Sequence, residues 1–292
     1  MKRIYSLKIL FWPSYILPLI EFVDDSGKKA IKTMGYCRDL VIEIINANTY
    51  RVVHSDRSCV EYASYILGRW VDFDQVKNVL EKNASRYTII RSLVNMFYDY
   101  GIAVSPRDDI EVFVSIFLSQ NTDYHKNTVK WVKKLLRDFA LEEIIDPRNR
   151  KILEEIGGSY QLRRLPEALK CYLRSRERIL AGEHKLLLEC PYVGPKIYYA
   201  YRLHVLLDLE VAPIDTNFFN FVERNLFHIV YSKPNKNLCR VYECGECPNR
   251  DKCIESILRS IFGISLGWLQ TIVFLYTDIE KGILRINNYM QN

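Results

Sequence analysis

The hydrophobic pattern of this chain changes its period near residues 58–70, and this change limits the folds open to it. Before that point, four runs rich in β-branched and aromatic residues favour strands: Ile4–Trp12, Lys29–Met34, Leu40–Ile45 and Tyr50–His54. The last two are joined through Asn46-Ala47-Asn48, which predicts an antiparallel hairpin. We therefore expect a small α+β domain with an antiparallel sheet over residues 1–68.

Beyond this point, apolar residues recur at helical spacing with almost no alternation. The segments that show it are Val76–Leu80, Ile89–Phe97, Ile110–Leu118, Val129–Leu136, Leu169–Leu180 and Leu258–Leu275. The total of 292 residues is more than one ordinary core needs and fits two domains. We predict a mainly α protein with an all-α body over residues 69–292.

Charge and hydropathy place further limits on the class of protein. With 49% hydrophobic and 26% charged residues, a collagenous or largely disordered chain is excluded. The net charge of +6 is compatible with a polyanionic partner but does not establish one. Basic residues gather on two predicted helices, as a solvated face or a phosphate-binding one: Lys126, Lys130, Lys133, Lys134 and Arg137 on the first, and Arg163, Arg164, Lys170, Arg174, Arg176 and Arg178 on the second.

The sequence predicts no secretory signal and no membrane span. The apolar run Ile9–Ile20 is interrupted by Pro13 and Pro18, and no small-residue cleavage site follows it. The most apolar later stretch, Trp268–Thr277, has about half of the ~20 residues that a span needs, so we expect a buried helix there. We expect a monomer that does not associate with membranes and is cytoplasmic or nucleoid-associated, or nuclear in a eukaryote, and not secreted.

Four of the eight cysteines are clustered. Cys239, Cys244, Cys247 and Cys253 form a loop, 239–253, with gaps of four, two and five residues. Four thiolates can ligate one metal centre, and both zinc and [4Fe–4S] clusters accept four cysteines. In a reducing compartment such a group is more often a metal site than a disulfide framework. We expect Cys37, Cys59 and Cys171 to be buried small apolar residues.

The segment 190–196 predicts a tight hairpin between two helices. Its sequence is Cys-Pro-Tyr-Val-Gly-Pro-Lys, and Pro195 is suited to the first position of a helix of about thirteen residues. A turn that leads into a helix N-terminus exposes unpaired backbone N–H groups, which can bind a DNA phosphate without reading a base. Tyr192, Val193 and Gly194 are the candidate DNA contacts in this turn.

Lys196 and Asp215 are the candidate catalytic pair. Lys196 falls in the first helical turn, where the helix dipole disfavours a cation and so favours a neutral, nucleophilic amine. Asp215 precedes Thr216 and is expected to cap the next helix. Taken singly, Lys196 could be an exposed lysine at a helix start and Asp215 a plain cap. Their combination in one hairpin context favours chemistry.

These segments resemble the helix–hairpin–helix DNA glycosylases of the endonuclease III and 8-oxoguanine glycosylase superfamily. That family has a Leu-Pro-Gly-Val-Gly-x-Lys hairpin followed by Val-Asp-Thr/Val-His. The resemblance implies that Lys196 is the Schiff-base lysine and Asp215 the catalytic aspartate. Tyr192 replaces the first hairpin glycine, so a left-handed turn there would be strained, and Asn217 replaces the histidine.

The resemblance extends over about residues 70–275 and implies further features. The fold would be a two-subdomain helix–hairpin–helix core behind a small α+β domain like that of 8-oxoguanine and alkylpurine glycosylases. Gln120, in Leu-Ser-Gln-Asn-Thr-Asp over 118–123, is similar to the endonuclease III glutamine that fills the space left by an everted base, although it could also be a polar helix-end residue. Cys190 stands where the family has an apolar residue. The cysteine loop matches the last two gaps of the endonuclease III cluster loop, which favours [4Fe–4S] over Zn²⁺.

The resemblance implies a base-excision repair glycosylase with AP (β-) lyase activity, whose partner is double-stranded DNA containing a damaged base. An oxidised base is the favoured substrate, 8-oxoguanine first and oxidised pyrimidines next. One alternative is a monofunctional mismatch uracil or thymine glycosylase, although such relatives usually lack the lysine. The other is a non-catalytic helix–hairpin–helix DNA-binding protein.

Overall fold

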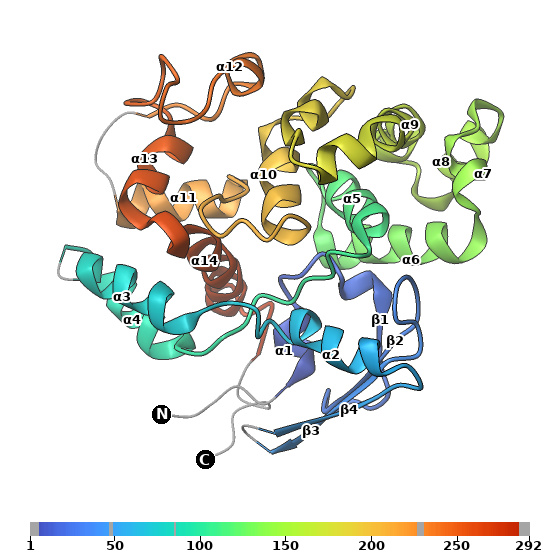
Figure 1. Cartoon of the computed structure of the whole chain (residues 1–292), viewed down its shortest axis with the longest axis horizontal. Helices are drawn as coiled ribbons and strands as arrows, with labels where there is room; N and C mark the ends of the chain where they lie inside the picture. Colours follow the sequence, from blue (N-terminus) through green and yellow to red (C-terminus); the bar gives the residue numbers. More distant parts are fainter. Residues whose placement is uncertain (1–5, 47–48, 85, 227–230, 286–292) are drawn as a thin grey trace.

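The computed structural model describes residues 6–46, 49–84, 86–226 and 231–285 (Figure 1). Four antiparallel strands form a sheet in sequence order: β1 (Ile20–Phe22), β2 (Lys29–Lys32), β3 (Val41–Asn46) and β4 (Thr49–Val53). Phe22 pairs with Ala30, Ala30 with Ile42, and Ile42 with Val52, so these residues share the face that packs on the core. The small antiparallel sheet expected near the N-terminus is confirmed; Ala47 and Asn48 of the expected turn lie outside the described residues.

The expected strand over Ile4–Trp12 is wrong. Residues 7–11 form helix α1 (Leu7–Phe11), and the Ser6 side chain caps it by accepting from the Lys8 N–H. Leu7, Ile9 and Phe11 are completely buried, and Leu10 nearly so, so apolar side chains leave the helix in all directions. A run that is buried on every side has no alternation, and its composition alone cannot distinguish strand from helix.

The rest of the chain is helical, as predicted. Helix α2 (Arg57–Ile66) packs on β4, and the 3-10 turn η1 (Leu17–Leu19) precedes β1. The body consists of α3 (Phe73–Ala84), α4 (Thr88–Phe97), α5 (Asp109–Leu118), the π-helical turn η2 (Tyr124–Thr128), α6 (Val129–Asp138), α7 (Leu141–Ile145), η3 (Pro147–Asn149), α8 (Arg150–Gly157), α9 (Tyr160–Leu180), η4 (His184–Glu189), α10 (Pro195–His204), α11 (Thr216–Asn225), α12 (Lys236–Val241), α13 (Ile254–Phe262), η5 (Gly263–Ser265) and α14 (Leu266–Glu280). Figure 1 shows α10, α11 and α14 near the centre, with the sheet and α12 at opposite edges of the view.

The stretch from α13 to α14, Ile254–Glu280, is longer and more apolar than expected. Its 27 residues, with a mean hydropathy of 1.5 in their most apolar window, would suffice to cross a membrane by length and composition. The expectation that no segment approaches such a length is therefore wrong. However, 61% of that window is buried inside the protein, and α14 packs against α4 and α11. This burial is typical of a core helix.

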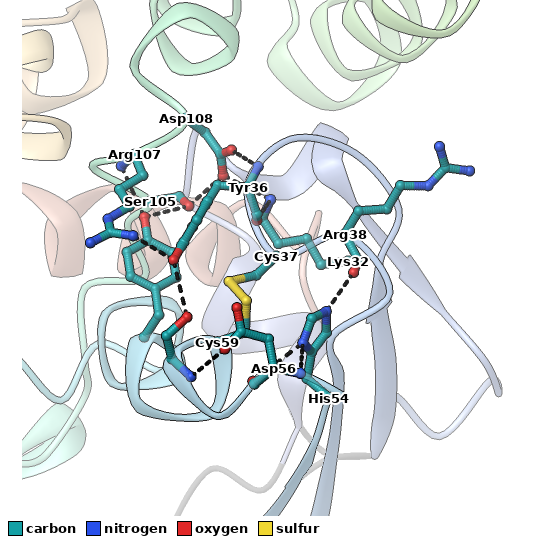
Figure 2. The surroundings of a disulfide bond; sticks show 12 residues. Lys32, Tyr36, Cys37, Arg38, His54, Asp56, Cys59, Ser105, Arg107 and Asp108 are labelled. Carbon is teal, nitrogen blue, oxygen red and sulfur yellow. Dashed lines mark hydrogen bonds and ion pairs between the residues drawn. A yellow bond between two sulfur atoms is a disulfide. The ribbon is translucent and has the colours of Figure 1, made fainter.

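A buried ion pair joins the sheet to the helical body (Figure 2). The Lys32 ammonium, at the end of β2, lies 2.8 Å from the carboxylate of Asp108, the residue before α5, and both side chains are buried. Lys32 also donates to the carbonyls of Met34 and Tyr36, and Asp108 accepts from the Tyr36 N–H and the Ser105 hydroxyl. Because both charges are fully hydrogen-bonded, removing either partner would leave the other buried and unpaired.

The four scattered cysteines form two disulfides. Cys37, in the loop between β2 and β3, is bonded to Cys59 of α2 (Figure 2), and Cys171 of α9 is bonded to Cys190 at the hairpin. The expectation that Cys37, Cys59 and Cys171 are merely small apolar residues is wrong, and Cys190 is more than an apolar hairpin residue. The partners are separated by 22 and 19 residues and come from different elements, so no local spacing reveals the pairing. Tertiary folding brings each pair of Cα atoms to about 5.5 Å, within the reach of a disulfide.

Candidate active site

The segment 190–196 forms the expected hairpin. The turn closes with a hydrogen bond from the Val193 N–H to the Cys190 carbonyl, and α10 begins at Pro195 with Gly194 as its N-cap. Helix α10 has 10 residues rather than about thirteen. Val193 is buried as a whole residue and its N–H is used within the turn, whereas the position of an added Cβ on Gly194 opens on empty space. The backbone at Gly194 is therefore accessible to a phosphate.

Tyr192 adopts the left-handed conformation that favours glycine, with φ of 62°. The residue is 40% exposed, and the Arg164 guanidinium of α9 lies 4.7 Å from the centroid of its ring. Arg164 is also 4.9 Å from the centroid of Tyr160, and the Tyr192 hydroxyl donates to Glu167 at 3.1 Å. These contacts hold the tyrosine in a conformation that costs roughly 1–3 kcal/mol.

The Lys196 side chain points from the first turn of α10 to the end of α5. Its ammonium donates to the Ser119 carbonyl at 3.2 Å. Burial lowers the pKa of Lys196, and the nearby Asp215 carboxylate opposes part of that shift. Burial therefore acts in the same direction as the dipole of α10, and both favour the neutral amine.

Asp215 is the N-cap of α11, as predicted. Its carboxylate accepts from the Phe218 N–H at 2.7 Å. Burial raises the pKa of Asp215, and the charge of Lys196 is the largest influence that opposes this rise. The two residues are electrostatically coupled: the negative charge of Asp215 favours the protonated form of Lys196, and the positive charge of Lys196 favours the ionised form of Asp215. The first turn of α10 and the N-cap of α11 thus bring Lys196 and Asp215 onto the same site.

Lys196 and Asp215 line one cavity of about 710 Å³. Its size falls within the range of small-molecule sites. The other walls come from the segment 118–123 that the sequence singled out, and from the N-terminal segment, the start of η2, the end of α10 and α14. They contribute, among others, Trp12, Tyr15, His125, His204, Gln270, Phe274 and Asp278.

The N-terminal segment is fixed to α14 at this cavity. The Trp12 indole donates to the Asp278 carboxylate at 2.8 Å, across 266 residues of sequence. The Trp12 ring stacks on His125, with ring centroids 3.7 Å apart. Because these residues are distant in the sequence and share no spacing pattern, only the fold could reveal that they form one wall.

Gln120 follows α5 but does not line this cavity. Its side-chain amide donates to the Phe117 carbonyl at 2.9 Å, and its backbone carbonyl accepts from Gln161 of α9. Its neighbour Asn121, at φ of 46°, does line the cavity and donates to the Tyr160 hydroxyl. The structure therefore places Gln120 beside the site, on the side of α9.

Several residues of the two basic runs have partners within the protein. Arg176 donates two hydrogen bonds to the carboxylate of Asp109, which is buried. Arg178 is paired with Glu183, and Arg137 with Asp138. These arginines are partly neutralised by their partners, so the runs offer fewer free charges to a phosphate than their sequence indicates.

The four clustered cysteines are free and line a second cavity, next to α10. The Tyr199 hydroxyl lies 3.7 Å from the Cys239 sulfur and 3.5 Å from the Cys244 sulfur. Burial raises the pKa of Cys239 to about 11. Among the described residues, no three Cys, His, Asp or Glu side chains are arranged to hold a single metal ion. The four cysteines share this cavity, and four thiolates are the donor set that a zinc ion or an iron–sulfur cluster accepts.

Comparison with known proteins identifies the fold. No protein-family model and no curated protein sequence matches this chain. The structure is similar to Clostridium acetobutylicum 8-oxoguanine glycosylase/lyase in complex with double-stranded DNA containing cytosine opposite 8-oxoguanine, with a TM-score of 0.72 and 16% identity over 95% of this chain and 93% of that one. It is also similar to MBOgg1 in complex with a low-affinity DNA ligand, with a TM-score of 0.64, 16% identity and the same coverage. The apo form of the clostridial enzyme gives a TM-score of 0.64 and 16% identity over 93% of each chain. The chain therefore has the 8-oxoguanine glycosylase fold, mainly helical with a small N-terminal antiparallel sheet, as predicted.

Proposed function

We propose that this protein is a DNA base-excision glycosylase with an associated lyase activity at abasic sites. The observation that carries this proposal is the placement of Lys196 and Asp215 on one cavity, with burial lowering the pKa of the lysine. The similar fold of a glycosylase/lyase solved with 8-oxoguanine DNA supports the same reading. Its substrate would be double-stranded DNA with an oxidised base, 8-oxoguanine first and oxidised pyrimidines next.

In this proposal the damaged nucleotide leaves the duplex and enters the cavity, at an unstacking cost of a few kcal/mol. The neutral Lys196 amine attacks the sugar C1′, the bond from C1′ to the base breaks, and the base leaves with the electron pair and takes up a proton. The lysine nitrogen then expels the ring oxygen, which becomes a hydroxyl, and a Schiff base forms. Loss of a C2′ proton expels the 3′ phosphate by β-elimination and cuts the strand.

Asp215 would act electrostatically and as a proton acceptor, and not as the nucleophile. Its carboxylate, coupled to Lys196, would stabilise positive charge that develops on the sugar and assist deprotonation of the amine. The DNA backbone would approach the open side of Gly194 and the exposed Tyr192. Gln120, beside the site, would occupy the space that the everted base leaves in the duplex.

We also propose that Cys239, Cys244, Cys247 and Cys253 hold a [4Fe–4S] cluster. A cluster distributes its four thiolate ligands over several iron atoms, so it does not require the sulfurs to converge on one point. The position of the four cysteines on one cavity, and the two gaps that the loop shares with the endonuclease III cluster loop, support this choice over Zn²⁺. When bound, the cluster would tie α12 to the start of α13 and supply structural support rather than a step of the reaction.

The experiment that tests the function is product formation from a panel of duplexes. Each duplex carries a single lesion, which is 8-oxoguanine, an oxidised pyrimidine, a mismatched uracil or thymine, or an abasic site. We expect release of the damaged nucleobase from the 8-oxoguanine duplex. We also expect strand cleavage on the 3′ side of the abasic site without alkali treatment. Base release from the mismatches alone, without strand cleavage, would indicate a monofunctional glycosylase, and binding without any product would indicate a non-catalytic DNA-binding protein.

A further inference from the structure

Arg164 of α9 is an exposed residue whose guanidinium contacts two tyrosine rings. It lies 4.7 Å from the ring centroid of Tyr192 in the hairpin and 4.9 Å from that of Tyr160 at the start of α9. An arginine on an exposed helix face ordinarily samples many rotamers, and attraction to two rings restricts that freedom. The guanidinium is therefore open to solvent and yet confined to one place beside the hairpin.

The N–H groups of the Arg164 guanidinium have no acceptor within the part of the chain that the structure describes. A carboxylate is present three residues further along α9, in Glu167. That carboxylate accepts from the Tyr192 hydroxyl at 3.1 Å and lies 3.9 Å from the Arg150 guanidinium, so its contacts are with other residues. The N–H donors of Arg164 are thus available to a ligand from outside the chain.

A guanidinium can stack on a ring and bind an anion at the same time. Its flat face packs on aromatic rings, whereas its N–H donors lie in its plane and point outward from its edge. Two of these donors match two oxygens of a phosphate in a bidentate contact. Because the rings already confine Arg164, less side-chain freedom is lost when it binds such a ligand.

Arg164 lies between the hairpin and the cavity wall. Tyr192 is two residues before Gly194, whose backbone is open to a phosphate. The Tyr160 hydroxyl accepts from Asn121, which lines the candidate active-site cavity. The guanidinium therefore contacts one ring that belongs to the hairpin and one ring that is hydrogen-bonded to the cavity wall. A nucleotide that enters this cavity carries phosphates on both sides, and these are the anions closest to the site.

We propose that Arg164 binds a backbone phosphate of the DNA next to the everted nucleotide, and that Tyr192 is a positioning residue that holds the guanidinium there. This inference rests on the proposed function and deepens it. It also explains a tyrosine in a left-handed turn: glycine would avoid the strain but would deprive the guanidinium of one of its rings. The contact adds affinity for DNA without reading its sequence.

The test measures binding to a duplex that cannot react. A tetrahydrofuran analogue of an abasic site lacks the C1′ hydroxyl, so it forms no Schiff base with Lys196, and its affinity for the protein is measured at several salt concentrations. Each phosphate that a protein neutralises contributes about 0.9 to the slope of log K against log salt. We expect Arg164→Ala to lower the affinity about tenfold and to reduce this slope by about 0.9. An unchanged affinity and slope would overturn the proposal.

Arg163 provides a matched control. It is exposed, it precedes Arg164 on α9, and its side chain contacts no aromatic ring or carboxylate among the described residues. Arg163→Ala removes the same charge and should leave the affinity and the slope nearly unchanged. Equal effects of the two substitutions would overturn the proposal, because they would show that only the overall charge of α9 matters.

A double-mutant cycle tests the role of Tyr192. Tyr192→Gly suits the left-handed turn and should keep the fold, which circular dichroism checks. It should weaken binding about threefold in the wild type and have almost no further effect in Arg164→Ala, because Tyr192 acts through the guanidinium. An equal loss in both backgrounds would overturn the positioning role and assign Tyr192 a direct contact with DNA.

Turnover by the wild type separates this inference from the proposed function. A protein that binds the analogue but processes neither an 8-oxoguanine duplex nor an abasic duplex would overturn the glycosylase and lyase activities. The binding measurements would still decide the role of Arg164 in that case. Processing of both duplexes, together with an unchanged affinity in Arg164→Ala, would overturn the inference alone.

Discussion

The Lys196 ammonium donates a hydrogen bond of 3.2 Å to the backbone carbonyl of Ser119, and this contact joins the helix after the hairpin to the end of α5. Ser119 immediately precedes Gln120 and Asn121, so the contact positions the proposed nucleophile against a loop that lines the cavity through Ser119 and Asn121. A carbonyl can accept from an ammonium or from a neutral amine. The contact therefore orients the Lys196 side chain in both protonation states.

The pH dependence of base excision follows from the directions of two pKa shifts. Because burial lowers the pKa of Lys196, the reactive neutral amine is populated below the ordinary lysine pKa of 10.5. Burial raises the pKa of Asp215, so its useful negative charge is lost on acidification sooner than for an ordinary aspartate. The rate should rise with pH and reach its plateau below 10.5.

Single-turnover rates between about pH 5 and pH 11 check this. Asp215→Asn should reduce the rate. It should also remove the part of the decline in rate at low pH that is caused by protonation of the Asp215 carboxylate. A wild-type rate that is still rising in proportion to hydroxide above pH 10.5 would contradict the lowered pKa of Lys196.

The two buried histidines of the cavity should make the protein sensitive to acid. Burial lowers the pKa of His125 to about 4 and that of His204 to about 3, whereas both take up protons near 6.5 in the unfolded chain. Unfolding therefore binds protons below pH 6.5, so the free energy of unfolding falls as the pH falls towards 3. The effect should be on the order of 3 kcal/mol or more.

Denaturant unfolding at a series of pH values measures this slope. A variant with His125→Gln and His204→Gln should lose most of the dependence between pH 6.5 and 4, because glutamine does not titrate. An unchanged slope in that variant would assign the acid sensitivity to other groups.

The two disulfides should differ in their effect on activity. Replacing Cys37 and Cys59 with alanine should lower the free energy of unfolding by about 3 kcal/mol, the loop-closure effect expected for 22 residues. Replacing Cys171 and Cys190 should cost a similar amount, because that loop spans 19 residues. Only the second pair fixes the hairpin to α9, so only its loss should also slow cleavage of abasic DNA.

Each double variant serves as the control for the other. Chemical reduction of the wild type should reproduce the summed loss of stability and the slower cleavage. Equal loss of cleavage in both variants, measured well below their melting temperatures, would argue against a specific role of the bond between Cys171 and Cys190.

The cysteine loop can be tested without measuring activity. We expect anaerobically purified protein to contain about four iron and four sulfide ions per chain, with no stoichiometric zinc. Cys247→Ser should reduce the iron content and lower the melting temperature. One zinc per chain and no sulfide would contradict the proposed cluster in favour of the single-ion alternative.

Local signals in the sequence predict several of the helices and turns that position the site. Helical periodicity predicts α3, α4, α5, α6, α9 and the stretch from α13 to α14, whereas α7, α8 and α12 are not among the predicted segments. Pro195 marks the start of α10, and Asp215 is expected as a cap. Each of these depends on residues within a few positions of one another, where backbone geometry decides the outcome. The exception is α1, where a run buried on all sides carried no usable period.

The cavity walls could not be predicted in the same way. Trp12 meets Asp278 across 266 residues, and Tyr15 packs edge-on against His204 across 189 positions of sequence. The disulfide partners likewise meet through tertiary packing. His204 lies eight positions after Lys196 on the same helix, and nothing in that spacing indicates that it lines the cavity.

The most direct test of the central claim is a borohydride trap. The wild-type protein is mixed with a duplex that contains 8-oxoguanine, or an abasic site, and reduced, and the covalent product is mapped by mass spectrometry. We predict one protein–DNA adduct per chain, located on Lys196, and its absence in Lys196→Gln, while Asp215→Asn forms the same adduct more slowly. An adduct that persists in Lys196→Gln, or maps to another residue in the wild type, would contradict the assignment of Lys196 as the nucleophile.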